Sequence, residues 1–93
     1  MIDDSIKLKD PQASLFYGFD WSEWLSPNEI IKSHTIYVSA SSLVITHDYH
    51  TSASVIFMAS GGEVGKRYSV TCEIETTGSQ VDERTIRLDI KNR

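Results

Sequence analysis

The stretch YSVTCEIE, residues 68–75, decides the fold because its apolar and polar residues alternate strictly. This period of two is typical of a β-strand with one buried face and one solvated face. The same alternation returns in TIRLDIK, residues 85–91, and the loop TTGSQ between the two stretches contains a glycine. We therefore predict an antiparallel hairpin. On its outer face we expect opposite charges to pair, with Glu73 and Glu75 against Arg87 and Lys91.

Four more stretches upstream show strand signals, and they cover residues 17–21, 34–40, 43–50 and 53–59. They are short, contain β-branched or aromatic residues, and are separated by turn-forming residues. No amphipathic pattern of about ten or more residues supports a long helix. Together with the hairpin, these stretches amount to about six or seven short strands, which is typical of an all-β sandwich.

Length and composition limit the fold and the function further. The 93 residues suffice for one domain, and the 40% hydrophobic and 24% charged content is ordinary for a globular one. The net charge of −4 argues against a nucleic-acid partner, because nucleic-acid binding usually needs a basic face. No apolar run approaches the roughly 20 residues that span a bilayer, so we expect no membrane partner. The single cysteine cannot form an internal disulfide, which fits a protein folded in a reducing cytoplasm.

The first ten residues, MIDDSIKLKD, are mostly polar and are followed by Pro11. We predict an extended N-terminal arm over residues 1–12 and a sandwich domain over residues 13–93. Such an arm can add a strand to the sheet edge of a neighbouring chain, and we expect residues 1–9 to become ordered only in an assembly. The apolar residues of the arm are candidate partner contacts, namely Ile2, Ile6 and Leu8.

Both tryptophans of the chain lie in FDWSEWL, residues 19–25. Asp20 and Glu23 have the spacing of a capping box, in which two side chains satisfy free N–H groups at the start of a helix. Pro27 disfavours helical backbone at the residue before it. We therefore predict one short helical turn over residues 22–25.

The spacing of the tryptophans also predicts where their rings point. Trp21, Trp24 and Leu25 are at positions i, i+3 and i+4, which share one face of a helical turn. We expect both indoles to close one end of the sandwich as part of its core, since each can bury on the order of 200 Å2. The alternative is a carbohydrate-binding module that stacks sugar rings on an exposed platform of Trp21 and Trp24. The exposure of the two rings distinguishes these alternatives.

Two histidines and an aspartate near the middle of the chain have the residue types of a metal site. His47, Asp48 and His50 lie close together in sequence, but on a strand the two histidines point to opposite faces. His34 would have to come from another strand. We therefore predict no metal site and interpret HDYHTS as a polar hairpin end. Its side chains are further candidate partner contacts, namely His47, Tyr49 and His50.

No residue pattern predicts catalysis or a cofactor. Cys72 lies at an inward position of the clearest strand, so we interpret it as a buried structural thiol. Asp82 and Glu83 read as solvated loop charge. The glycines of SGGEVG, residues 60–65, lack the Lys and Ser/Thr of a phosphate-binding loop and predict a turn. Tyr68, which follows this turn, can bury its ring and return its hydroxyl to the backbone.

Two motifs of the chain resemble those of a family of small structural proteins from tailed bacteriophages and prophages. These motifs are DWSEWL at residues 20–25 and SGGEVGKRYSVTCEI at residues 60–74. The resemblance runs from about residue 9 to residue 93 and departs at FMAS, residues 57–60, and at the histidine-bearing stretch. The residues that carry it are Asp20, Trp21, Trp24, Leu25, Gly61, Gly62, Gly65 and Tyr68.

The resemblance implies an immunoglobulin-like β-sandwich of about seven strands. It also implies a non-enzymatic virion protein, often a fiber–tail adaptor, that needs no cofactor. Its expected partners are other phage tail or fiber proteins and further copies of itself. Its expected location is the host cytoplasm during assembly and then the tail of the virion.

Overall fold

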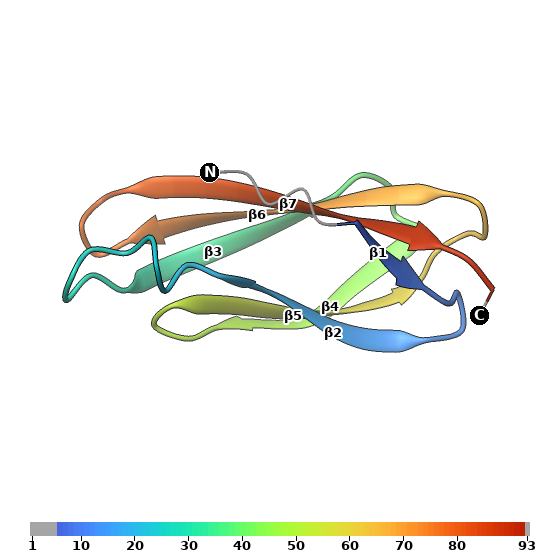
Figure 1. Cartoon of the computed structure of the whole chain (residues 1–93), viewed down its shortest axis with the longest axis horizontal. Helices are drawn as coiled ribbons and strands as arrows, with labels where there is room; N and C mark the ends of the chain where they lie inside the picture. The colour runs from blue at the N-terminus through green and yellow to red at the C-terminus, as the bar shows by residue number, and fades with distance from the viewer. Residues whose placement is uncertain (1–5, 93) are drawn as a thin grey trace.

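The structure is a computed structural model that describes residues 6–92, which form seven strands and their connecting turns. The strands are β1 (Ile6–Lys9), β2 (Ser14–Asp20), β3 (Ile31–Val38), β4 (Leu43–His50), β5 (Ser54–Gly61), β6 (Arg67–Thr76) and β7 (Val81–Ile90). They form a four-stranded sheet A, in the order β1-β7-β6-β3, and a three-stranded sheet B, in the order β2-β5-β4. Figure 1 shows the sheets as two layers. Residues 6–92 include no helix that is long and apolar enough to cross a membrane.

The strand order is that of an immunoglobulin-like sandwich. The neighbours in β2-β5-β4 and β7-β6-β3 correspond to strands B-E-D and G-F-C of that fold. Strand β1 departs from the constant-type arrangement, because it pairs in parallel with β7 in sheet A. The prediction of an all-β, immunoglobulin-like sandwich is therefore confirmed.

The predicted hairpin forms the centre of sheet A. Strands β6 and β7 pair antiparallel, and alternate residues of both are buried. The expected pairing of Glu73 with a basic residue is wrong, because Glu73 lies opposite Glu83. The basic partner in this hairpin is Arg67, whose guanidinium donates to the Asp89 carboxylate at 2.5 and 3.1 Å. The short loop over residues 77–80 sets the register, and outer-face charges follow from that register.

The described part of the expected N-terminal arm is a strand of sheet A. Ile6–Lys9 pairs with β7, and Lys9 is completely buried. The Lys9 ammonium donates to the carbonyl oxygen of Gly61 at 2.7 Å and to that of Asp10 at 2.9 Å. Burial lowers the pKa of Lys9. Residues 6–9 are thus ordered in the single chain, contrary to the expectation of order only in an assembly, while Ile2 lies outside the described residues.

The core lies between the inner faces of the two sheets. An aromatic row crosses it, with ring centroids 5.9 Å apart for Tyr17 and Phe57, 5.9 Å for Phe57 and Phe19, and 5.7 Å for Phe19 and Trp21. Cys72 is fully buried as predicted, and burial raises the pKa of its thiol to about 12. The buried core residues are Phe19, Trp21, Ile31, Leu43, Val55, Phe57, Ala59, Tyr68, Val70, Cys72, Ile74, Ile86, Leu88 and Ile90.

The glycine-rich turn and Tyr68 form one structural unit. Tyr68 is 1% exposed, and its hydroxyl accepts the N–H of Glu63 at 3.0 Å and shares a hydrogen bond of 2.5 Å with the Ser42 hydroxyl. Gly62 has a φ of 95°, and a Cβ at this position would lie 2.8 Å from the Ile90 side chain. The motif therefore encodes a turn that only glycine fits, next to a tyrosine that holds it.

Candidate functional site

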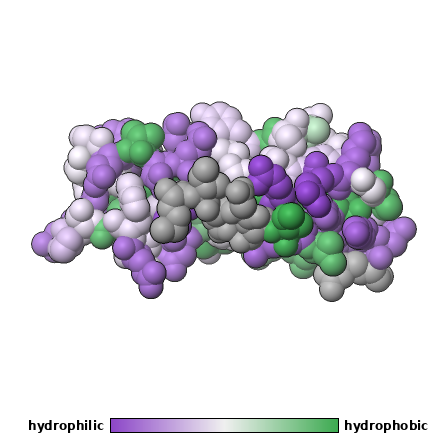
Figure 2. Space-filling view, turned by 45° about the horizontal axis from the view of Figure 1, so that its top comes forward, coloured by the Kyte–Doolittle hydropathy of each residue, from purple (hydrophilic) through white to green (hydrophobic). Residues whose placement is uncertain are grey.

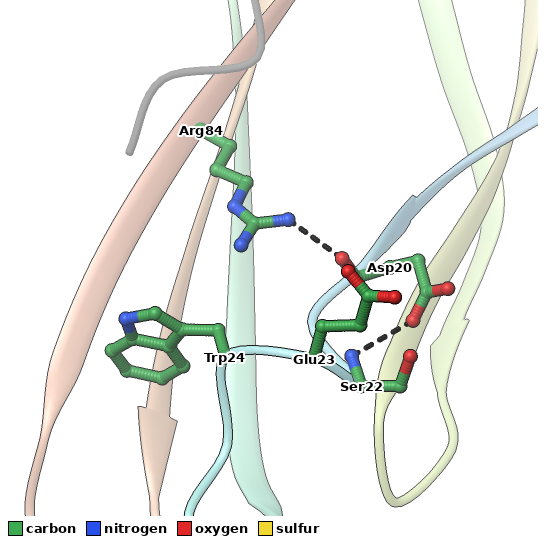
Figure 3. A pocket seen from close by; sticks show the side chains of 5 residues that line it. All are labelled: Asp20, Ser22, Glu23, Trp24 and Arg84. Atoms are coloured by element: carbon green, nitrogen blue, oxygen red, sulfur yellow. Dashed lines mark hydrogen bonds between the residues drawn. The ribbon is translucent and has the colours of Figure 1, made fainter.

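A cavity of about 390 Å3 opens where β2 ends, between the two sheets. Figure 3 shows the side chains that line it. Two elements supply them: the end of β2 with the turn that follows, and β7. The lining residues are Asp20, Ser22, Glu23, Trp24 and Arg84.

The segment after β2 is a turn and not a helix. The N–H groups of Trp24 and Leu25 donate to the Trp21 carbonyl at 2.9 and 3.1 Å, which makes a single turn that is not continued. Asp20 acts at its start as expected, since its carboxylate accepts the N–H of Ser22 at 2.8 Å. This backbone hydrogen bond holds the pKa of the Asp20 carboxyl below its usual value. The predicted helical turn is present as this single hydrogen-bonded turn, and it does not continue into a helix.

The two tryptophans have different environments. Trp21 is 0% exposed, and its indole N–H donates to the Asp82 carboxylate at 2.8 Å. Trp24 is only partly buried, packs against the core and lines the cavity. The core prediction is therefore right for Trp21 and half right for Trp24. A stacking platform of both rings is wrong, because the Trp21 ring has no exposed face.

Arg84 connects the two sheets beside this cavity. It is 9% exposed, and its Nη1 donates to the backbone carbonyl of Asp20 at 2.6 Å. Its guanidinium carbon lies 4.8 Å from the centroid of the Trp21 ring, within range of a cation–π interaction. Asp82 lies 3.6 Å from the Arg84 Nε atom. The guanidinium is thus held between an indole, a carboxylate and a carbonyl.

Sequence reasoning missed the roles of Asp82 and Arg84. Asp82 was expected to be loop charge, but it lies in β7 and faces inward. A signal was available, because both residues are in phase with the buried positions Ile86 and Leu88 of the same strand. The resulting cavity combines carboxylates, a guanidinium and one indole face.

A second polar cluster joins β3 to β4. The Nδ1 atoms of His34 and His50 lie 2.7 Å apart, and the Nε2 atom of His34 lies 2.8 Å from Asp48 Oδ2. The hydrogen bond with His34 lowers the pKa of the Asp48 carboxyl. A register irregularity between Thr46 and Tyr49 allows this geometry. Among residues 6–92, no three side chains of His, Cys, Asp or Glu are placed to hold a metal ion.

The candidate partner contacts do not form one patch. HDYHTS is the end of the β4–β5 hairpin as predicted, since β4 ends at His50 and the Thr51 N–H donates to the Ser54 carbonyl at 2.8 Å. The His50 ring is bound to His34. His47 is exposed, with a φ of 53°. Ile6 and Leu8 are 53% and 47% exposed on β1, in the other sheet. Tyr49 is 51% exposed, on the outer face of sheet B.

The outer faces of the two sheets have different chemistry. On sheet A the outward positions of β6 and β7 carry six charged residues: Arg67, Glu73, Glu75, Glu83, Arg87 and Asp89. Figure 2 shows hydrophilic residues over much of this side, with apolar residues in small groups. The outward positions of sheet B are Ser14, Phe16, Gly18, Asp20, Val44, Thr46, Tyr49, Ser54, Ile56, Met58 and Ser60. Of these described outward positions, only Asp20, at one corner of the sheet, carries a charge.

These features define a small immunoglobulin-like β-sandwich domain. Residues 9–89 match the family model Gp77, described as Podophage GP4 fiber-tail adaptor protein gp77. Because the match covers most of the chain, the chain belongs to this family, and the resemblance to phage fiber–tail adaptors is confirmed. Its class is therefore a structural protein of the phage tail. No curated protein sequence matches the chain.

Proposed function

We propose that this chain is a non-enzymatic adaptor that connects a phage tail to its fibers through protein–protein contacts. The observation that carries the proposal is the family match over residues 9–89, since that family is described by a fiber–tail adaptor. In this role the chain folds in the host cytoplasm and is then built into the tail of the virion. Its partners are other tail or fiber proteins, with no nucleic acid or membrane involved.

Two surfaces support a role in protein contacts. The outer face of sheet B exposes Phe16, Val44 and Tyr49 by 57%, 48% and 51%, and neighbouring outward positions are uncharged. The cavity beside Trp24 offers a partly buried indole with polar groups around it. Protein interfaces commonly combine aromatic anchors with a polar rim. The remaining candidate contacts, Ile6 and Leu8 on sheet A and His47 and His50 on β4, lie outside these two surfaces and are separate candidates for contact with a partner.

Phage assembly tests the proposal. Particles made without the chain are expected to lack fibers, and supply of the wild-type chain is expected to restore them. Fibers that attach normally in its absence would contradict the proposal. Addition of polysaccharide to the isolated chain tests the sugar-binding alternative, and we expect Trp24 fluorescence to stay unchanged because a single partly buried indole provides no two-ring platform.

The contribution of the cavity is tested by Trp24→Ala in the same assembly assay. We expect fewer attached fibers, because the indole is the largest apolar group that lines the cavity. The matched control is Tyr37→Ala, which removes an aromatic ring that is 52% exposed in sheet A. Equal loss of fibers in both variants would show that the cavity has no special part in the contact.

A further inference from the structure

The edge strands of the two sheets differ in how well they are protected from pairing. Strand β1 has four residues, including Lys7, and short edges with lysines resist pairing with another chain. Strands β3 and β4 carry register irregularities, between Ile31 and Ser33 and between Thr46 and Tyr49. Such irregularities also protect an edge.

Strand β2 has none of these features. Its register with β5 is continuous over seven residues, from Ser14 opposite Ser60 to Asp20 opposite Ser54. Its sequence, SLFYGFD, contains no lysine or proline, and its one charge is at the end. Strand β2 therefore lacks the features that usually prevent an edge strand from pairing with another chain.

The backbone groups on the free side of β2 follow from one hydrogen bond. The N–H of Trp21 donates to the Ala53 carbonyl at 2.8 Å, which continues the β2–β5 register. Because the direction of these groups alternates along a strand, the odd-numbered residues of β2 bond to β5. The N–H and C=O groups of Ser14, Phe16 and Gly18 face the open edge, whereas the Asp20 carbonyl at its end accepts Arg84 Nη1. Phe16, at the centre of that edge, is 57% exposed.

We propose that β2 pairs antiparallel with β2 of a second copy of this chain and joins the two B sheets into one continuous sheet. The register that pairs all seven residues of β2 places Tyr17 on the two-fold axis. In this register Phe16 lies opposite Gly18 of the second copy, and Ser14 lies opposite Asp20. Both hydrogen bonds can form in each Phe16–Gly18 pair, because the backbone groups of these residues face the edge. The Ser14–Asp20 pairs contribute less, because the Asp20 carbonyl already accepts Arg84 Nη1 at 2.6 Å.

The strand is complementary to itself in shape and charge. Gly18 has no side chain, and Ile56 of β5 partly covers its outward position, since Ile56 Cδ1 would lie 3.3 Å from a Cβ there. The Phe16 ring of the second copy approaches this glycine from the other side, and an aromatic ring on a neighbouring strand compensates for a glycine in a sheet. Asp20 faces a serine, and the two aspartates lie at opposite ends of the paired strands, so no like charges meet. The uncharged outward residues beside the strand, such as Ile56 and Met58, add no repulsion. A second copy therefore fits this edge as an occupant.

The size of the contact predicts a weak dimer. A seven-residue edge is about 23 Å long, and its pairing buries less than the roughly 800 Å2 per partner of a standard interface. We expect dissociation at about 0.1–1 mM in solution, with a larger paired fraction where copies are held close together in an assembly. The proposal does not depend on the adaptor function, since it concerns the isolated chain.

Amide hydrogen exchange by NMR tests the pairing at single residues. Samples of the 15N-labelled chain are compared at roughly 20 µM and roughly 2 mM. The amides of Phe16 and Gly18 are expected to exchange several-fold more slowly in the concentrated sample. The amides of Tyr17 and Phe19 already bond to β5 and are expected to show no such change. Fast exchange at Phe16 and Gly18 in both samples would overturn the proposal, and would leave this edge to a different protein.

Two lysine variants test whether the edge, and not the outer face, holds the dimer. Phe16→Lys places a charge on β2, and Val44→Lys places the same charge on β4 at a position of similar exposure, 48% against 57%. By sedimentation equilibrium we expect Phe16→Lys to weaken the dimer at least tenfold, about 1.4 kcal/mol, and Val44→Lys to leave it unchanged. Equal weakening by both variants would contradict pairing through β2. If Phe16→Lys fails to fold, the exchange measurement on the wild-type chain decides.

Discussion

The outer faces of sheets A and B differ in charge at their centres, although their inner faces are built alike. In both sheets alternate residues are buried, from Phe19 and Phe57 in sheet B to Ile74 and Ile86 in sheet A. Outside, sheet A presents charged residues on β6 and β7, whereas sheet B presents serines, Phe16 and other uncharged residues. The same alternation thus gives both sheets an apolar inner face for the core, while their outer faces differ in the residues that a partner would meet.

Because of this difference, the inner faces determine the stability of the fold, and the outer faces determine how the chain associates with other proteins. Burial of the inner face contributes to folding whatever lies outside, because successive side chains of a strand point to opposite faces. A charged outer face stays solvated and resists contact with other chains. Covering an uncharged, partly apolar face with another protein removes few charged groups from water, so the cost in desolvation free energy is small. The charged centre of sheet A, over β6 and β7, is therefore suited to face water, and the outer face of sheet B is suited to face a partner.

The largest expected effect contrasts two phenylalanines of sheet B. Phe57 is 0% exposed on the inner face, and Phe57→Ala is expected to lower the free energy of unfolding by about 3–5 kcal/mol through lost burial and a cavity. Phe16 is 57% exposed on the outer face, and Phe16→Ala is expected to change it by less than about 0.5 kcal/mol. Urea unfolding of the dilute protein measures both values. A similar cost for the two variants would show that the outer face also supports the fold.

The same contrast in sheet A is expected to be smaller. Tyr68→Phe removes a hydroxyl that accepts the Glu63 N–H and bonds to Ser42, at a cost of about 1–3 kcal/mol. Tyr37 is 52% exposed, and Tyr37→Phe serves as the matched control, with an expected change below about 0.5 kcal/mol. Thermal unfolding of both variants gives the comparison. Equal melting temperatures for the two would remove the assigned role of the Tyr68 hydroxyl.

A third test concerns the end of the molecule, where the turn before β3 meets the β6–β7 hairpin. The Glu29 carboxylate accepts hydrogen bonds from the Thr76 hydroxyl, the Ser26 N–H and the Gln80 amide. The Thr76 bond is the main cause that lowers the pKa of Glu29 in the folded chain below 4.5. Glu29→Gln is therefore expected to lower stability at neutral pH.

The pH dependence of this loss has a definite sign. A carboxyl whose pKa is lower in the folded chain stabilises it fully above the unfolded pKa of 4.5 and stops doing so as the pH falls through the folded value. The advantage of the wild type over Glu29→Gln should therefore be present at pH 7 and shrink below pH 4.5. Urea midpoints at several pH values measure this advantage. An advantage that persists in strong acid would rule out ionisation as its source.

The smallest expected effect is on the charged face of sheet A. Arg67 and Asp89 form a bidentate pair on adjacent strands, and the Arg67 side chain is 54% exposed. Because water screens such a pair, Arg67→Gln, on the outer face, is expected to reduce stability less than the inner-face variants Phe57→Ala and Tyr68→Phe and the end-turn variant Glu29→Gln. Most of this reduction should vanish in concentrated salt. A large loss that is insensitive to salt would mean that the outer face of sheet A contributes to the fold.

The local pattern of residues predicted strands better than it predicted their partners. The alternation in residues 68–75 and 85–91 identified β6 and β7, and their inward residues are buried as expected. It did not predict that Glu73 would lie opposite Glu83, because register depends on loop geometry. It also placed residues 6–9 outside the sandwich, because four residues carry too short a pattern to identify a parallel partner such as β7.

The candidate site was predicted only in part for a related reason. Asp20 and Trp24 were identified from their motif, and both line the cavity. Arg84 and Asp82 were not, because a charged residue at an inward position is recognised only when its partner is known, and here the partners lie on β2 and the turn after it. Likewise, His34 meets His50 only because β3 and β4 are neighbouring edges of different sheets.

The sequence by itself determined the all-β class, the central hairpin, the glycine turn before Tyr68 and the inward position of Cys72, because each follows from a local alternation of apolar and polar residues or from turn-forming residues. The tertiary structure decided which tryptophan is buried, where Arg84 donates, and which sheet has the uncharged outer face. These depend on contacts between residues far apart in the chain, such as the Trp21 indole and Asp82. Periodicity assigns a residue to a face of its strand, but the pairing and stacking of strands decide what that face meets.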